Sequence, residues 1–131
     1  MERLIYRSRA LWPAPEAALD AILATSMPTN AGLSVTGVLG FTGRTYVQLL
    51  EGPAGALDLL LGRLRADPRH TDLTLLMRAP VASRLVPGWT MARVDLAEPA
   101  PRVEALLRAN DGLALAVLMA NLAHQGATGV A

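Results

Sequence analysis

The sequence contains no cysteine and no lysine among its 131 residues. Without cysteine there can be no disulfide, no thiolate metal site and no cysteine nucleophile. Without lysine, Schiff-base chemistry and the lysine-dependent phosphate loop are excluded. The two histidines, at positions 70 and 124, are far apart and do not predict a zinc site. We therefore expect no bound metal.

An excess of charge of one sign is also lacking. Twelve arginines stand against eleven acidic residues, for a formal net charge of +1. This balance gives no electrostatic reason to expect binding to nucleic acid or to an anionic membrane. The most apolar run, residues 112–123, is far shorter than the ~20 residues that span a bilayer. The N-terminus shows no secretory signal, so we expect a cytoplasmic protein.

The residues that are present predict a single α+β domain. Hydrophobic residues make up 52% of the chain and charged residues 18%, which argues against disorder. Apolar runs and alternation predict five strands, over residues 3–8, 33–41, 44–50, 73–77 and 89–94. Apolar spacings of three and four residues predict four helices: one between Pro15 and Pro28, one opened by Pro53, and two over 101–109 and 112–124.

The order β-α-β-β-α-β-β indicates a ferredoxin-like sandwich. It consists of a five-stranded mixed sheet with two crossover helices on one face, followed by two C-terminal helices. The strands are apolar on both faces, since Val47 and Leu49 oppose Tyr46, Gln48 and Leu50. The second face therefore needs a cover, which the C-terminal helices or a second subunit can supply.

A few polar or aromatic residues stand inside apolar runs. Gln48 is in mid-strand on a face that a helix should cover, and an unpaired buried amide costs ~1–3 kcal/mol. Taken alone, Tyr6 is an ordinary core tyrosine and Asn30 is a turn residue. Trp89 and Met91, taken alone, are residues that pack in the core. No serine–histidine pair, dinucleotide fingerprint or carboxylate pair stands out, which argues against an enzyme.

Taken together, these positions resemble the BLUF domain, a family of blue-light sensors that use FAD. The matching segments are Tyr6-Arg-Ser8, the run from Asn30 to Leu39, the run from Tyr46 to Pro53, Asp67-Pro-Arg-His70 and Gly88-Trp-Thr-Met91. Each segment is weak alone, whereas the set is specific. The resemblance implies a short, stand-alone member of the family, with a flavin-binding domain over residues 1–95 and a helical extension over 96–131.

The resemblance also implies a flavin site between the crossover helices and the sheet. FAD is the expected cofactor, with FMN or riboflavin as substitutes. The residues expected to bind it are Tyr6, Ile22, Asn30, Leu39, Gln48, Leu57, Arg69, His70 and Met91. Asn30 would bind the polar edge of the ring. Arg69 and His70 would lie near the ribityl or phosphate end, or else in a solvated exit loop.

The photochemistry that the resemblance implies rests on Tyr6 and Gln48. Tyr6 would give an electron to the excited flavin, and Gln48 would relay its proton, because a neutral phenol loses both together. Rotation or tautomerism of the Gln48 amide would then reverse its hydrogen bonds and shift the absorption to the red. Trp89 and Met91 would relay the change to the C-terminal helices.

The chain after residue 95 is too short for a cyclase, phosphodiesterase or DNA-binding effector. We therefore expect output through a homo-dimer or higher oligomer, or through a separate effector protein. The main alternative is a light-independent, ferredoxin-like module that binds a small ligand, which does not explain Tyr6 together with Gln48. An acylphosphatase-like hydrolase and a flavin-dependent redox enzyme fit less well, because no suitable phosphate loop or nicotinamide site is present.

Overall fold

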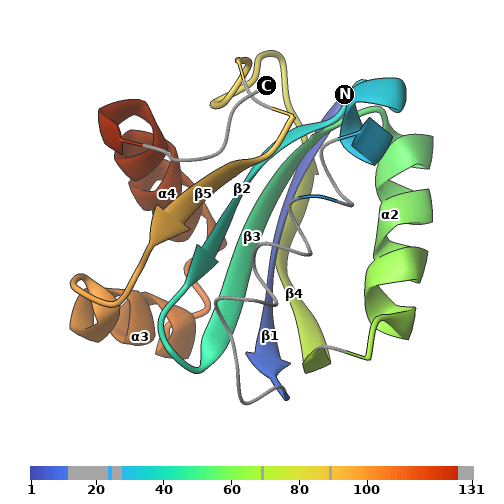
Figure 1. The fold of residues 1–131 in the computed structure, drawn as a ribbon. Coiled ribbons are helices and arrows are strands. Elements are labelled where there is room, and N and C mark those ends of the chain that lie inside the picture. Colours follow the sequence, from blue (N-terminus) through green and yellow to red (C-terminus); the bar gives the residue numbers. More distant parts are fainter. Residues whose placement is uncertain (12–23, 25–27, 69, 89, 127–131) are drawn as a thin grey trace.

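The computed structural model describes residues 1–11, 24, 28–68, 70–88 and 90–126. Its elements, in chain order, are β1 Glu2–Ala10, β2 Thr36–Phe41, β3 Thr45–Gly52, α2 Ala54–Ala66, β4 His70–Pro80, β5 Ala92–Asp95, α3 Ala100–Arg108 and α4 Gly112–Gly126. One sheet contains all five strands, with α2 on one side and α3 and α4 on the other (Figure 1). Most of the predicted first crossover helix, including Ile22, lies outside the described residues.

Strand pairing confirms the predicted mixed sheet and the ferredoxin-like plan. The strand order is β4-β1-β3-β2-β5, and every neighbouring pair is antiparallel except β2 with β5. β1 and β2 therefore run parallel with β3 between them, and β3 and β4 run parallel with β1 between them. These are the two split crossovers expected of the fold. β5 lies at the edge opposite β4, so the chain that joins them must cross the whole sheet.

Alternate side chains of the strands enter two separate cores. On one side, which we call the α2 face, Leu4 and Tyr6 of β1 pack with Tyr46, Leu50 and the buried leucines of α2. On the other side, the α3/α4 face, Ile5 and Leu49 pack against buried residues of both C-terminal helices, namely Val103, Leu107, Leu115, Ala116 and Met119. The C-terminal helices therefore cover the second face, as predicted.

The segment before β2 differs from the sequence prediction. Residues 28–32 are helical, whereas a stop was predicted at Pro28; the fixed φ of proline is compatible with a helix. The predicted strand over 33–41 begins only at Thr36. Ser34 adopts a left-handed φ of 58°, and two N–H groups after the helix donate back to carbonyls of its last turn. This is the Schellman arrangement that closes helices.

The last two strands also differ from their predicted spans. β4 is longer than 73–77 because it pairs with β1 along nearly its whole length, starting at His70. β5 begins at Ala92 rather than at position 89, so Met91 precedes the strand. The predicted β2–β3 turn at Thr42-Gly43 is confirmed, and Gly43 adopts a φ of 107° that other residues rarely tolerate.

α4 presents apolar residues to solvent as well as to the core. Leu113 and Val117, four positions apart, are 55% and 42% exposed. These two side chains form an outward stripe on one face of the helix. Within the described part of the chain, no helix combines the length and apolar character needed to cross a membrane.

Candidate functional site

A row of buried side chains crosses the middle of the α2 face. Tyr6 on β1 pairs with Gln48 on β3, which in turn pairs with Leu39 on β2. None of the three is more than 2% exposed. Leu57 of α2 belongs to the same core cluster as Tyr6 and Leu39. The fold therefore brings together four of the residues predicted to form the site.

The side-chain amide of Gln48 is hydrogen-bonded at both ends. Its Oε1 accepts a hydrogen bond from the hydroxyl of Tyr6. Its Nε2 lies 3.4 Å from the sulfur of Met91, which is fully buried. A thioether sulfur accepts hydrogen bonds but cannot donate them, so the amide NH₂ must face Met91. Met91 thereby selects one orientation of the amide.

Gly37 on β2 makes room for this arrangement. A Cβ atom at position 37 would overlap the carbonyl oxygen of Leu49 and would lie 3.3 Å from the Cε of Met91. A side chain there would push β2 away from β3 and press on the methionine. In the sequence Gly37 is only part of a family-like run, and the close approach is visible only in the structure.

Asn30 connects the end of the first crossover segment to the residue before Met91. Its Nδ2 donates a 2.8 Å hydrogen bond to the carbonyl of Thr90, and the side chain is 1% exposed. The other polar atom of the side chain is the carbonyl oxygen Oδ1, a hydrogen-bond acceptor. This oxygen is the atom that the predicted contact with the edge of a flavin ring would use.

Burial raises the pKa of the Tyr6 hydroxyl far above its ordinary value of about 10. A phenolate at this position would lose its hydration, and negative charge on Asp67 and Tyr46 acts in the same direction. The phenol is therefore neutral at every pH near neutrality. Loss of an electron from such a group is coupled to loss of its proton.

The described residues of the α2 face fit a flat ligand with apolar faces and a polar edge. Ser8 lies two residues from Tyr6 on the same face, and its buried Oγ has no partner among the described residues. Unpaired buried polar groups are costly, and a polar ligand edge would relieve that cost. Leu39 and Leu57 offer apolar surface beside them. This donor and acceptor set suits a flavin.

Four predicted site residues are not placed by the structure. Ile22, Arg69 and Trp89 lie outside the described residues. His70 begins β4, opposite Ala10, but its side chain is outside the described part. The flavin contacts of Ile22, Arg69 and His70 and the relay role of Trp89 remain predictions.

A surface hollow of about 570 Å³ lies at the end of β1, and Ser8 of the candidate site is part of its lining. Its lining includes Arg7, Arg9, Arg44 and Glu104. Tyr6 and Gln48 are not among its lining residues. Among the residues that the structure describes, no cluster of histidine and acidic side chains is placed to hold a metal.

Glu51 is a residue whose importance the sequence analysis missed. It lies three residues after Gln48 on β3 and is completely buried, although it is charged. The available signal was a carboxylate directly after Leu49 and Leu50 on a strand predicted to be covered on both faces, where a charge is rarely buried unless it is paired.

Comparisons with known proteins agree with this geometry. A family model described as "BLUF: Sensors of blue-light using FAD" matches residues 1–92. The chain is 42% identical over 89 residues to the photoactivated adenylate cyclase subunit beta of Euglena longa, a match that covers 67% of this chain. It spans only about a tenth of the length of that protein and of its Euglena gracilis counterpart.

Two solved structures are also similar. One is BlrB, a BLUF protein in its dark state, with a TM-score of 0.74 and 36% identity over 80% of this chain and 82% of that chain. The other is BlrP1 of Klebsiella pneumoniae with FMN and cyclic diGMP, with a TM-score of 0.69 and 38% identity. That match covers 82% of this chain and 29% of BlrP1.

Proposed function

The chain belongs to the BLUF family of flavin-using blue-light sensors, and from this premise we propose that Tyr6 and Gln48 carry its photochemistry. When bound, the flavin supplies blue-light absorption and an excited state that accepts an electron. Tyr6 is the donor, because its neutral, buried phenol sits against the Gln48 amide. The hydroxyl proton leaves along the same hydrogen bond, toward the Oε1 of Gln48. The observation that carries this proposal is the Tyr6–Gln48–Met91 chain of contacts.

The orientation of the Gln48 amide makes the rearrangement reversible. If the amide turned over, its carbonyl would face the Met91 sulfur, which has no hydrogen to donate. Leaving a buried carbonyl without a partner costs about 1–3 kcal/mol. The dark orientation is therefore favoured, and the molecule returns to it after rotation or tautomerism of the amide. A small red shift of the absorption is the expected signature of the lit state.

FAD is the proposed cofactor, with FMN or riboflavin as substitutes. The similar BlrP1 structure contains FMN, and the apolar walls and polar edge described above suit the ring that all three share. We assign flavin binding to residues 1–95 and output to residues 96–131, without enzymatic turnover by the chain itself. A cytoplasmic location is part of the same proposal and rests on the sequence.

The proposed output runs from Met91 through β5 to α3 and α4, which pack on the same core as β5. The outward stripe of Leu113 and Val117 on α4 is apolar surface that a second copy of the chain would cover. We therefore propose a homo-dimer or higher oligomer, with a separate effector protein as the receiver of the signal. Leu113→Asp is expected to give a one-chain mass by light scattering where the unaltered protein gives two. A one-chain mass for the unaltered protein, in dark and light, contradicts the dimer.

Absorption spectra of the purified protein test the proposed photochemistry. The unaltered protein should be yellow and should show a small red shift under blue light that decays in the dark. Tyr6→Phe should keep the flavin, because the ring remains, and should lose the shift, because the proton-coupled donor is gone. A normal photocycle in Tyr6→Phe contradicts the assignment. Protein that stays colourless after flavin supplementation supports the light-independent ligand-binding module instead.

A further inference from the structure

The connection between β4 and β5, residues 81–91, crosses the sheet from one edge to the other, and we call it the crossing loop. It passes over the ends of β1, β3 and β2 in that order. Near its start, Val81 N donates to the carbonyl of Met1, and Arg3 Nη2 donates to the carbonyl of Ser83. Its last residue is Met91, whose sulfur meets the Gln48 amide. The course of this loop therefore sets where that sulfur lies.

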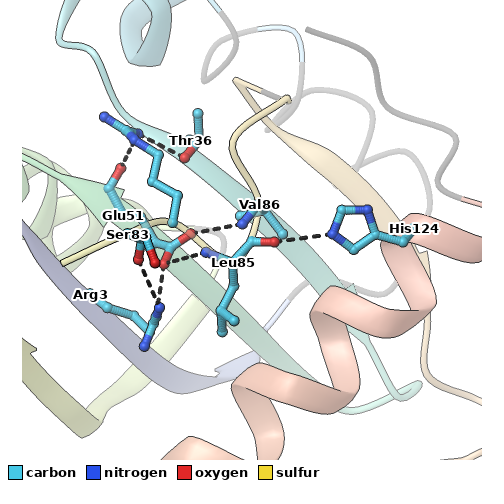
Figure 2. A network of polar contacts seen from close by, with 8 residues as sticks. Arg3, Thr36, Glu51, Ser83, Leu85, Val86 and His124 are labelled. Atoms are coloured by element: carbon cyan, nitrogen blue, oxygen red, sulfur yellow. Dashed lines mark hydrogen bonds and ion pairs between the residues drawn. The ribbon is translucent and has the colours of Figure 1, made fainter. Parts of the chain in front are cut away.

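Glu51 holds the middle of the crossing loop. Its Oε1 accepts from the backbone N–H of Val86 at 2.9 Å, and its Oε2 accepts from that of Leu85 at 3.0 Å (Figure 2). Arg3 Nε lies 2.8 Å from the same Oε2 and supplies the compensating charge. Hydrogen bonds to a charged acceptor are about twice as strong as neutral ones. The carboxylate thus fixes two consecutive loop residues against the end of β3.

Arg84 fastens the same part of the loop to β2. Its Nη1 donates to Thr36 Oγ1 at 2.8 Å and to the carbonyl of Glu51 at 2.9 Å, and its Nη2 donates to the carbonyl of Ser34 at 2.7 Å. From the other side, His124 Nε2 on α4 lies 3.1 Å from the carbonyl of Leu85 (Figure 2). Residues 84–86 are therefore held by β2, β3 and α4 together.

We propose that Glu51 is a positioning residue for the light reaction: by fixing the crossing loop at Leu85 and Val86, it holds Met91 against the Gln48 amide. Glu51 and Gln48 lie on the same strand, so the position of the loop is fixed relative to the amide. Only four residues separate Val86 from Met91, and one of them, Thr90, accepts a hydrogen bond from Asn30. Releasing the loop at Glu51 would let Met91 withdraw and would weaken the preference for the dark amide orientation. This inference rests on the proposed function.

The first test follows dark recovery after blue light in flavin-loaded protein. Glu51→Gln keeps the shape of the side chain but removes its charge and turns one acceptor into a donor. We expect recovery to slow by about threefold or more, and Met91→Leu to slow it similarly. The double variant should recover no more slowly than Met91→Leu alone, because both changes act on one contact. Asp58→Asn is the matched control, since that carboxylate is 66% exposed and pairs only with Arg78 among the described residues.

The second test needs no light and no flavin. Oxidation of Met91 by peroxide in the dark, followed by peptide mass spectrometry, reports how well the buried sulfur is covered. Glu51→Gln should speed that oxidation by about threefold or more, with Asp58→Asn unchanged. If Glu51→Gln does not fold, Glu51→Asp decides by the same two measurements, since it keeps the charge beside Arg3 but shortens the side chain that reaches the N–H groups of Leu85 and Val86.

Recovery and Met91 oxidation at the unaltered rates in these variants overturn the inference. The inference is also overturned if the double variant slows recovery by the product of the two single-variant factors, because Glu51→Gln and Met91→Leu would then act independently. An unaltered protein with no light response contradicts the proposed function, and the oxidation test then still decides whether Glu51 holds Met91.

Discussion

The two faces of the sheet are built from alternate residues of the same strands, yet they differ in kind. Among the described residues, the hydrophobic cluster on the α3/α4 face consists of aliphatic residues, alanine and methionine, and the one buried charge on this side is Glu51, at the end of β3. The α2 face contains both tyrosines of the chain in its cluster, and the buried polar residues Gln48 and Ser8 alternate onto the same side. Neighbouring residues on one strand, Gln48 and Leu49, therefore serve opposite purposes.

This contrast separates stability from function. Burying apolar side chains stabilises a fold roughly in proportion to the area removed from water, whereas burying an amide gains little even when it is paired. A glutamine in the centre of β3 is thus not explained by stability, because leucine would fill the position at lower cost. Its pairing with Tyr6 and Met91 fits the switch proposed above.

The largest expected effect is loss of the light response in Gln48→Leu. This variant removes both hydrogen bonds of the amide and should abolish the red shift completely, while flavin stays bound. Leu49→Val, the neighbouring residue on the opposite face, should keep the shift and cost only about 1 kcal/mol of stability. Light-minus-dark absorption spectra compare the two. A red shift that survives in Gln48→Leu would mean that the two faces do not differ in the way described.

On the α3/α4 face, the largest effect should be on stability. Leu115 is fully buried in that cluster, so Leu115→Ala should lower the free energy of unfolding by about 2–5 kcal/mol through lost burial and a cavity. Urea unfolding followed by circular dichroism measures this loss, and the red shift of the folded fraction should be unchanged. An altered red shift would show that this face takes part in the photochemistry.

Asn30→Ala should have a smaller effect, on flavin affinity. Removing an amide that bonds Thr90 and is proposed to contact the ring should weaken binding about tenfold, which corresponds to about 1.4 kcal/mol. Titration of flavin into the apo-protein measures it. Asn121→Ala, at an exposed position of α4, is the matched control and should bind as the unaltered protein does. Equal affinity of both variants would remove Asn30 from the site.

The smallest effect should be that of alkaline pH on the photocycle. Because the pKa of Tyr6 is raised in the folded protein, its phenol should stay protonated at about pH 10, where an ordinary tyrosine is half ionised. The red shift should therefore keep its amplitude from neutrality to about pH 10. The stability that this proton confers is fully present below about pH 10 and is lost as the pH rises further, since only the unfolded phenol ionises there. A red shift that disappears with a midpoint near pH 10 would contradict the burial argument.

Local patterns in the sequence were enough to predict which face each strand residue occupies. Alternation placed Tyr46, Gln48 and Leu50 together and Val47 and Leu49 opposite them, and the sheet agrees. The need for a second cover was also predicted, since both faces of the strands are apolar. The end of the first crossover segment was not predicted, because the residue that closes it in a left-handed conformation is Ser34 and not glycine.

The sequence by itself determined the alternation of the strands, the polar residues buried among apolar ones and the family-like set of motifs, because each depends on residues close together in the chain. Only the tertiary structure decided that the Met91 sulfur contacts the Gln48 amide and that Gly37 leaves space for Met91. It also decided that the Glu51 carboxylate accepts hydrogen bonds from the crossing loop. These contacts join residues more than 30 positions apart. Their geometry follows from how the strands are ordered across the sheet, and no local pattern in the chain encodes that order.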